Sequence, residues 1–209
     1  MDRFAQLQSL IASDARRMHV LVLARELGLP DCWVAAGFVR SRVWDHLHQY
    51  APSPLPQDID VIWFDPDRPG AEQDAVLEKR LHARDASLGW SVKNQARMHL
   101  RNGDLPYGSA SDAMRHWPET ATAVGVRLDA QGRIEIAAPF GLDDLFGLVV
   151  RPTAAFLTLK RAAWLERLRA KQWRTSWPRL TMLAPGHQGS GVAAPCSSTT
   201  GTGDTDRMP

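Results

Sequence analysis

The chain has few cysteines, no long apolar run and almost no excess of charge. Only Cys32 and Cys196 occur among its 209 residues, far apart in sequence, which argues against a disulfide framework and favours a reducing compartment. No apolar run approaches the roughly 20 residues that a membrane-spanning helix needs. The start Met1-Asp2-Arg3-Phe4 lacks the charged-then-apolar pattern of a signal peptide. We therefore expect a soluble, cytoplasmic protein with no membrane partner.

The balance of charge excludes a strong affinity of the whole chain for polyanions. The sequence has 25 Lys and Arg against 23 Asp and Glu, a formal net charge of +2. A local basic face is still compatible with this balance. The Arg-rich segment from Lys160 to Lys171 reads as a solvated helix face, with contact to RNA as the alternative.

Composition and length predict one globular domain followed by a tail. The hydrophobic fraction of 44% is ordinary for a folded protein, and the chain is long enough to bury a core. From Ala184 onward the residues are mainly Gly, Ser, Thr, Ala and Pro, which bury too little apolar area to offset the entropy of ordering. We expect a domain of residues 1–183 and a disordered tail of residues 184–209.

Apolar periodicity predicts alternating helices and strands in the first half of the domain, which indicates an α+β architecture. The expected helices are one that begins near Phe4 and ends at Leu29-Pro30, then 38–50, 71–86, a short one that Ser109 caps, and 153–171. The expected strands are 33–36, 58–64 and 90–94, followed by a hairpin of 124–128 and 134–137.

Asp58 and Asp60 stand one residue apart at the start of an apolar, β-branched segment that reads as a strand. Side chains at positions i and i+2 of a strand point to the same face, so the two carboxylates would lie side by side. A shared Mg²⁺ ion would relieve their repulsion, and Mg²⁺ is commonly held by one or two carboxylates plus substrate phosphates. The alternative is a pair of local turn residues.

Gly37 lies between the predicted strand 33–36 and the helix that follows it. A strand that runs through Gly into a helix presents backbone N–H groups and the positive end of the helix dipole, which attract phosphate. Arg40 and Ser41 could add phosphate contacts. The alternatives are a structural turn at Gly37, a solvated Arg40 or an Arg40–Asp45 pair, and a plain first-turn role for Ser41.

Several ordered motifs resemble a bacterial nucleotidyltransferase-like family of the DNA polymerase β superfamily, long labelled as a domain of unknown function. The resemblance covers roughly residues 5–182. The motifs are Ala36-Gly37-Phe38-Val39-Arg40, Val43-Trp44-Asp45, Asp58-Ile59-Asp60-Val61, Val92-Lys93-Asn94-Gln95-Ala96-Arg97-Met98-His99, Trp117-Pro118-Glu119-Thr120-Ala121-Thr122-Ala123-Val124-Gly125 and Pro139-Phe140-Gly141-Leu142-Asp143-Asp144-Leu145-Phe146.

The resemblance implies a polymerase-β-like fold, a small mixed sheet flanked by helices, and Mg²⁺-dependent nucleotidyl transfer. Asp58 and Asp60 would hold one or two Mg²⁺ ions, and Gly37, Arg40 and Ser41 would surround a nucleoside triphosphate. The acceptor would be a small molecule, a protein or RNA. The alternative is a catalytically degenerate module of the same fold that binds a nucleotide or RNA.

Three departures from the superfamily pattern keep this alternative open. Phe38 follows the turn glycine where Ser or Gly is usual, and Ser41 stands where this family commonly has Asn. The predicted strand 90–94 has no acid to activate the acceptor, only Lys93 and Asn94, which are either accessory site residues or a polar network that fixes the sheet. The other candidates for a third acid are Glu135, Asp143 and Asp144.

Overall fold

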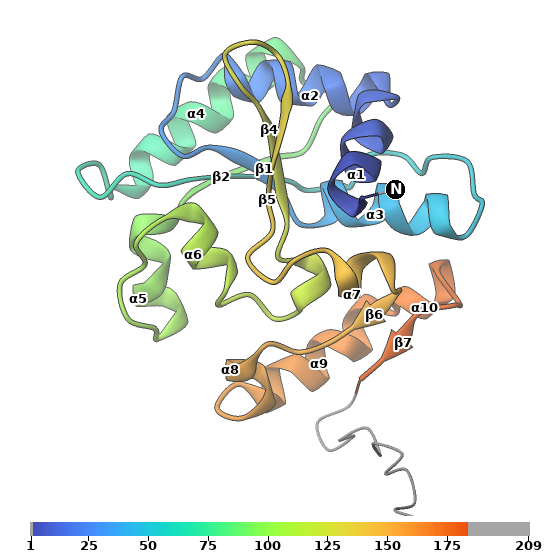
Figure 1. Cartoon of the computed structure of the whole chain (residues 1–209). Coiled ribbons are helices and arrows are strands. Elements are labelled where there is room, and N and C mark those ends of the chain that lie inside the picture. Colours follow the sequence, from blue (N-terminus) through green and yellow to red (C-terminus); the bar gives the residue numbers. More distant parts are fainter. Residues whose placement is uncertain (1, 184–209) are drawn as a thin grey trace, which may run out of the picture.

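The computed structural model describes residues 2–183 and has a five-stranded mixed sheet with helices packed against it (Figure 1). The strands are β1 (Trp33–Ala35), β2 (Ile59–Trp63), β3 (Trp90–Asn94), β4 (Gly125–Leu128) and β5 (Ile134–Ala137), in the order β3-β2-β1-β4-β5. β2 and β3 are parallel, whereas β1 is antiparallel to both of its neighbours and β4 and β5 form an antiparallel hairpin. The α+β fold predicted from the sequence is confirmed.

Most expected elements occur within a few residues of their predicted bounds. The helices that match are α3 (Gly37–Leu47), α4 (Ala71–Arg84) and α6 (Ala110–Met114). The Ser109 side chain accepts a hydrogen bond from the Asp112 N–H at 2.9 Å, as a helix N-cap does. Between β3 and α6, the chain also forms the turn η1 (Gln95–Arg97) and the short helix α5 (Met98–Asn102), and η2 (Thr120–Thr122) precedes β4.

The prediction of one N-terminal helix was wrong, because the chain forms α1 (Arg3–Ala12) and α2 (Ala15–Arg25) instead. Asp14 separates them: its carboxylate accepts a hydrogen bond from the Arg17 N–H at 3.1 Å and so caps α2. The Arg17 side chain is 1% exposed, and its Nε donates to the Phe38 carbonyl at 2.9 Å. This contact ties α2 to the start of α3.

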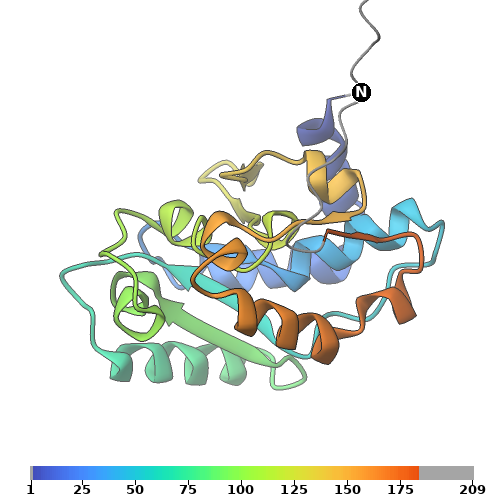
Figure 2. The same cartoon turned by 90° about the horizontal axis from the view of Figure 1, so that it is seen from below.

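The predicted helix 153–171 is interrupted at residues 158–160, where Thr158 leaves helical geometry with φ of −120° and ψ of −92°. The chain forms α8 (Ala154–Leu157) and α9 (Arg161–Lys171) there, and α9 ends at the predicted residue. The flanking elements are α7 (Asp143–Phe146) and β6 (Val149–Val150) before it, and α10 (Trp173–Ser176) and β7 (Thr181–Met182) after it. Gln172, with φ of 43°, turns the chain between α9 and α10. Trp173 and Trp177 then meet the buried Trp44 edge-on, with ring centroids 5.8 and 5.2 Å apart. α9 and α10 lie below the sheet in the view of Figure 1, and Figure 2 shows the domain from that side.

The two faces of the sheet differ. Val34 of β1 with Val61 and Trp63 of β2 belong to the larger hydrophobic core. Trp33 and Ile62 turn to the opposite face, where Ala110, Met114 and Trp117 cover part of them. No helix in the described range 2–183 is long and apolar enough to cross a membrane. The predicted tail, 184–209, lies outside the described residues.

Candidate active site

The turn at Gly37 leaves free donors at the start of an eleven-residue helix. Ala36, with φ of 54°, takes the backbone out of β1, and its carbonyl accepts hydrogen bonds from Val39 N–H and Arg40 N–H. The N–H groups of Gly37 and Phe38 make no hydrogen bond within residues 2–183. Such free amides, together with the helix dipole, are able to bind an anion.

Asp60 lies directly beside this turn. In the antiparallel register of β1 and β2, Asp60 pairs with Ala35, the residue before the turn. Asp58 lies two residues earlier, in a bend just before β2 begins, and it is exposed. Burial raises the pKa of Asp60, the negative charge of Asp58 raises it further, and the charges of Arg40, Lys171 and Arg167 oppose both effects. The two predicted carboxylates therefore interact with each other beside the predicted turn.

Asp60 lines a cavity of about 560 Å³ between the open face of the sheet and the C-terminal helices. Its wall includes Ala36, Ile62, Ser91, Lys93 and Gln95 from the sheet side, with Met98, Arg101, Asn102, His116, Trp117, Pro118, Thr122, Phe156, Lys160, Ala163 and Arg167 around it. Asp60 is the one acidic residue among the described residues of this wall. The remaining polar side chains are cationic or neutral, a composition that suits an anionic ligand near a metal-binding carboxylate.

Arg40 lies on α3 against two tryptophan rings, and it is not among the residues of the cavity wall. Its guanidinium carbon lies 5.1 Å from the ring centroid of Trp44 and 4.8 Å from that of Trp173. Burial lowers the pKa of Arg40 to about 10, although the negative charge of Glu119 acts in the opposite direction. Its Nε is buried and has no hydrogen-bond partner in the described part of the chain. The alternative pairing with Asp45 does not occur, since Asp45 accepts hydrogen bonds from Ser53 and Trp177.

The other predicted site residues lie apart from the carboxylates or are occupied. Ser41 is 7% exposed on α3 and is not part of the cavity wall. The Lys93 stem lines the cavity, but its amine donates to Glu78 at 2.7 Å. Asn94 is fully buried and bonds the backbone of Asp65, Arg68 and Ala96. Its contacts match the polar network that was the alternative interpretation.

None of the three further acids considered from sequence lines the cavity. Glu135 pairs with Arg127 at 2.6 Å, and Asp143 pairs with Arg3. Asp144 accepts hydrogen bonds from Arg151 and from the Thr120 hydroxyl. The residue beside Asp60 on β3 is Ser91. Among residues 2–183, no group of three or more His, Cys, Asp and Glu side chains could hold a metal ion.

Sequence reasoning missed Arg167 and Glu119 as residues of the site: Arg167 falls within the segment Lys160 to Lys171 that was read as a solvated helix face, and Glu119 appeared only within a family motif. Arg167 lines the cavity from α9, and its Nε donates to the fully buried Glu119 at 2.6 Å. The two residues are 48 positions apart, so no local pattern links them. An Arg on the same helix face as the buried Trp164, three residues earlier, was the available signal.

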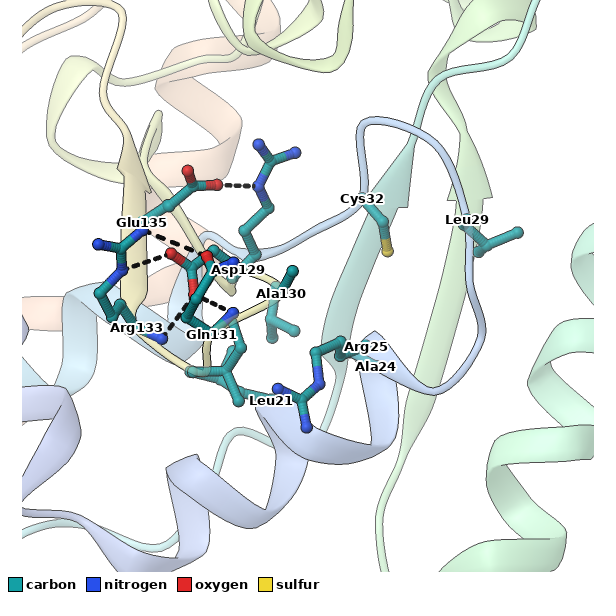
Figure 3. A pocket seen from close by; sticks show the side chains of 13 residues that line it. Leu21, Ala24, Arg25, Leu29, Cys32, Asp129, Ala130, Gln131, Arg133 and Glu135 are labelled. Atoms are coloured by element: carbon teal, nitrogen blue, oxygen red, sulfur yellow. Dashed lines mark hydrogen bonds and ion pairs between the residues drawn. The ribbon is translucent and has the colours of Figure 1, made fainter.

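Two other large cavities lie away from the carboxylates. One, of about 440 Å³, lies between α2 and the β4–β5 hairpin, and Cys32 lines it (Figure 3). The acids in its wall are paired locally, Glu135 with Arg127 and Asp129 with Arg133 (Figure 3). The other, of about 910 Å³, lies between α2 and the 54–57 linker. Neither contains a residue of the predicted site.

Comparisons with known proteins identify the family and the fold. A family model described as nucleotidyltransferase matches residues 22–182. A solved structure described as revealing a CCA-adding enzyme head domain is 36% identical, with a TM-score of 0.77, covering 86% of this chain and 95% of that chain. No curated protein sequence matches.

More distant structures share the fold. A CCA-adding enzyme in complex with CTP is 17% identical, with a TM-score of 0.55, and the match covers 86% of this chain and 43% of that one. The Thermotoga maritima CCA-adding enzyme complexed with tRNA is 15% identical, with a TM-score of 0.55 and coverages of 85% and 42%. The chain thus spans less than half the length of these two enzymes.

Proposed function

The chain belongs to the nucleotidyltransferase family, and from this we propose that it transfers a nucleoside monophosphate from a nucleoside triphosphate to an acceptor hydroxyl. One observation carries the proposal. Asp60, coupled to Asp58, lies beside the free amides of the Gly37 turn and lines a cavity large enough for a small ligand. Asp58 and Asp60 are proposed as the metal ligands, and Gly37 and Arg40 as the polyphosphate ligands.

The residues present fit a hard divalent cation. The donor set is two carboxylates two residues apart, Asp60 in β2 and Asp58 just before it, and carboxylate oxygens are the ligands that Mg²⁺ prefers. The raised pKa of Asp60, caused by burial and then by Asp58, is consistent with a pair whose repulsion a cation would relieve. When bound, Mg²⁺ would neutralise charge on the transferring phosphoryl group and on the leaving pyrophosphate.

The side chains and amides of this chain would contribute binding and orientation. The Gly37 and Phe38 N–H groups would donate to phosphate oxygens at the start of α3, and the Arg40 guanidinium would add charge-assisted contacts. The acceptor hydroxyl would then attack the α-phosphorus, forming a new P–O bond as the bond to pyrophosphate breaks. Such a reaction depends mainly on positioning and on electrostatic stabilisation.

The related structures support a nucleotide and RNA as partners. CCA-adding enzymes of similar fold have been solved with CTP, with ATP and with tRNA. The ligands of these enzymes support a nucleoside triphosphate as donor, and they favour RNA among the three acceptor classes of small molecule, protein and RNA. Ser41 stays a weaker candidate for phosphate contact, since it is buried on α3.

A catalytically degenerate binding module is the second candidate. The observation that favours it is Ser91, a hydroxyl beside Asp60 where a third carboxylate would be expected to activate the acceptor. A module of this kind would bind the nucleotide or RNA and release no pyrophosphate.

The test measures binding of a nonhydrolysable nucleoside triphosphate with and without Mg²⁺, and pyrophosphate release across a panel of acceptors. Asp58→Ala and Asp60→Ala should each lose the Mg²⁺-dependent part of the binding, whereas Asp67→Ala, an exposed acid in the turn after β2, should keep it. Unchanged Mg²⁺-dependent binding in both site variants would refute the assignment. If the parent chain binds the nucleotide but releases no pyrophosphate in the presence of any acceptor, the binding module is favoured.

A further inference from the structure

Two guanidinium groups from different helices lie against one indole ring. The guanidinium carbon of Arg40, on α3, is 4.8 Å from the ring centroid of Trp173, and that of Arg167, on α9, is 5.4 Å from it. Trp173 itself is 5% exposed and packs edge-on against Trp44. The indole therefore holds both cations in place before any ligand arrives.

Glu119 fixes the orientation of Arg167. Its fully buried carboxylate accepts hydrogen bonds from Arg167 Nε at 2.6 Å and Nη2 at 3.3 Å, and from the Thr122 hydroxyl at 3.0 Å. A guanidinium has five N–H donors, so Arg167 keeps others for a ligand in the cavity that it lines. A two-point contact of this kind holds the fork of Arg167 rigidly.

The positive charge near the turn is only partly neutralised. Glu119 makes an ion pair with Arg167, but Arg40 has no ion pair among residues 2–183. The buried Nε of Arg40 also lacks an acceptor there. Burying a cation without a partner costs free energy. An anionic ligand that paired with Arg40 would remove this cost, so an unpaired Arg40 is expected of a group that binds such a ligand.

We propose that Arg40 and Arg167, held against Trp173, form a polyphosphate clamp, and that Glu119 is the positioning residue for Arg167. The proposal rests on the proposed function for the source of the polyphosphate, a nucleoside triphosphate. The clamp itself recognises the polyphosphate group and would also take inorganic tripolyphosphate. The alternative is that the Glu119–Arg167 pair only anchors α9 to the rest of the domain.

The test is calorimetric binding of inorganic tripolyphosphate and of a nonhydrolysable nucleoside triphosphate, both with Mg²⁺, to the full chain. Arg167→Ala alone would leave the buried Glu119 unpaired and destabilise the fold. The informative variant is therefore Arg167→Met combined with Glu119→Gln, which removes both charges at similar volume. Arg169→Ala is the matched control, an exposed residue of the same helix without an ion pair in the described range.

The double variant should bind both polyphosphates about tenfold to a hundredfold more weakly while its melting temperature stays close to that of the parent. Its affinity for the nucleoside monophosphate should change far less. Arg169→Ala should bind as the parent does. If the double variant melts lower but binds tripolyphosphate normally, the pair is only an anchor and the clamp is refuted.

The clamp and the proposed reaction fail in different ways. One outcome is that the parent chain binds tripolyphosphate, the double variant binds it weakly, and no pyrophosphate is released in the presence of any acceptor. This outcome supports the clamp and refutes the transferase. Nucleotidyl transfer with an unchanged nucleotide KM in the double variant supports the transferase and refutes the clamp. A parent chain that binds neither polyphosphate, or an Arg169→Ala variant that loses as much affinity as the double variant, also refutes the clamp.

Discussion

Ser91 of β3 lies beside Asp60 of β2 in the parallel register of the two strands. Both residues line the same cavity, so a carboxylate at position 91 would lie beside Asp60, one of the two proposed metal ligands. The proposed mechanism lacks a third acid that would activate the acceptor. Residue 91 of β3 is in the position where such an acid would lie, but its side chain is a serine hydroxyl.

Ser91→Asp is expected to tighten Mg²⁺ binding severalfold, because a third carboxylate adds charge to the donor set. Without Mg²⁺ the same change should lower stability by roughly 0.2–1 kcal/mol, since like charges on adjacent strands repel. Calorimetric titration with Mg²⁺ measures the first effect and urea unfolding the second. Ser91→Asn, which has a similar volume and no charge, is the control and should show neither effect.

Asp60→Asn is expected to raise the melting temperature at neutral pH in the absence of Mg²⁺. Burial and the Asp58 charge raise the pKa of Asp60 in the folded state, so ionised Asp60 disfavours folding at every pH above that pKa. This penalty is relieved as the pH falls through the raised pKa, because the folded chain then takes up a proton more readily than the unfolded chain. A thermal melt at pH 7 checks the prediction, and a lower melting temperature would contradict it.

Mg²⁺ affinity should fall with pH for the same reason. Protonation of Asp60 removes a ligand, and its raised pKa moves this loss to a pH above the ordinary range of a carboxyl group. Mg²⁺ titrations over a series of pH values measure the midpoint. A midpoint at or below the ordinary Asp value would mean that Asp60 is not a ligand.

Asn94→Ala is expected to destabilise the fold by about 2–3 kcal/mol, since it removes several hydrogen bonds to the backbone of the 65–68 loop and Ala96. It should leave Mg²⁺ affinity unchanged at temperatures where the variant is folded. Urea unfolding and Mg²⁺ calorimetry test the two parts. A variant of normal stability with weaker Mg²⁺ binding would instead make Asn94 an accessory site residue.

Cys32 is expected to resist alkylation while the chain is folded. Burial raises the pKa of its thiol to about 12, so almost no reactive thiolate is present at pH 8. In a Cys196→Ser background, iodoacetamide should label Cys32 quickly in urea and slowly in buffer. Since the folded-state pKa exceeds the ordinary thiol value of 9.0, stability should also fall as the pH rises between the two values, and Cys32→Ala should remove this fall.

The sequence was sufficient to predict the carboxylate pair and the glycine turn, because both are local patterns. The strand alternation of Asp58 and Asp60 and the turn at Gly37 depend on neighbouring residues, and the sheet brings the two together through the pairing of Ala35 with Asp60. The family resemblance, now confirmed, supplied the order of these motifs. The roles assigned to these residues stay predictions.

Long-range contacts were beyond the reach of sequence patterns. Glu119 meets Arg167 across 48 residues, and neither residue is unusual in its own segment. The break between α1 and α2 was missed because the apolar spacing continues across Asp14, whose capping contact outweighs the helical periodicity. The break between α8 and α9 was missed because residues 158–160 include no Gly or Pro that would mark the end of a helix.

The position of α9 and α10 in the chain sets an order of events during synthesis. The strand with Asp60 and the turn at Gly37 leave the ribosome about a hundred residues before the helices that carry Arg167 and Trp173. A nascent chain could therefore assemble its sheet while α9 and α10, which carry Arg167 and Trp173, are still inside the exit tunnel. The proposed polyphosphate clamp would form only after translation has passed α10, so these two helices would complete the proposed site last.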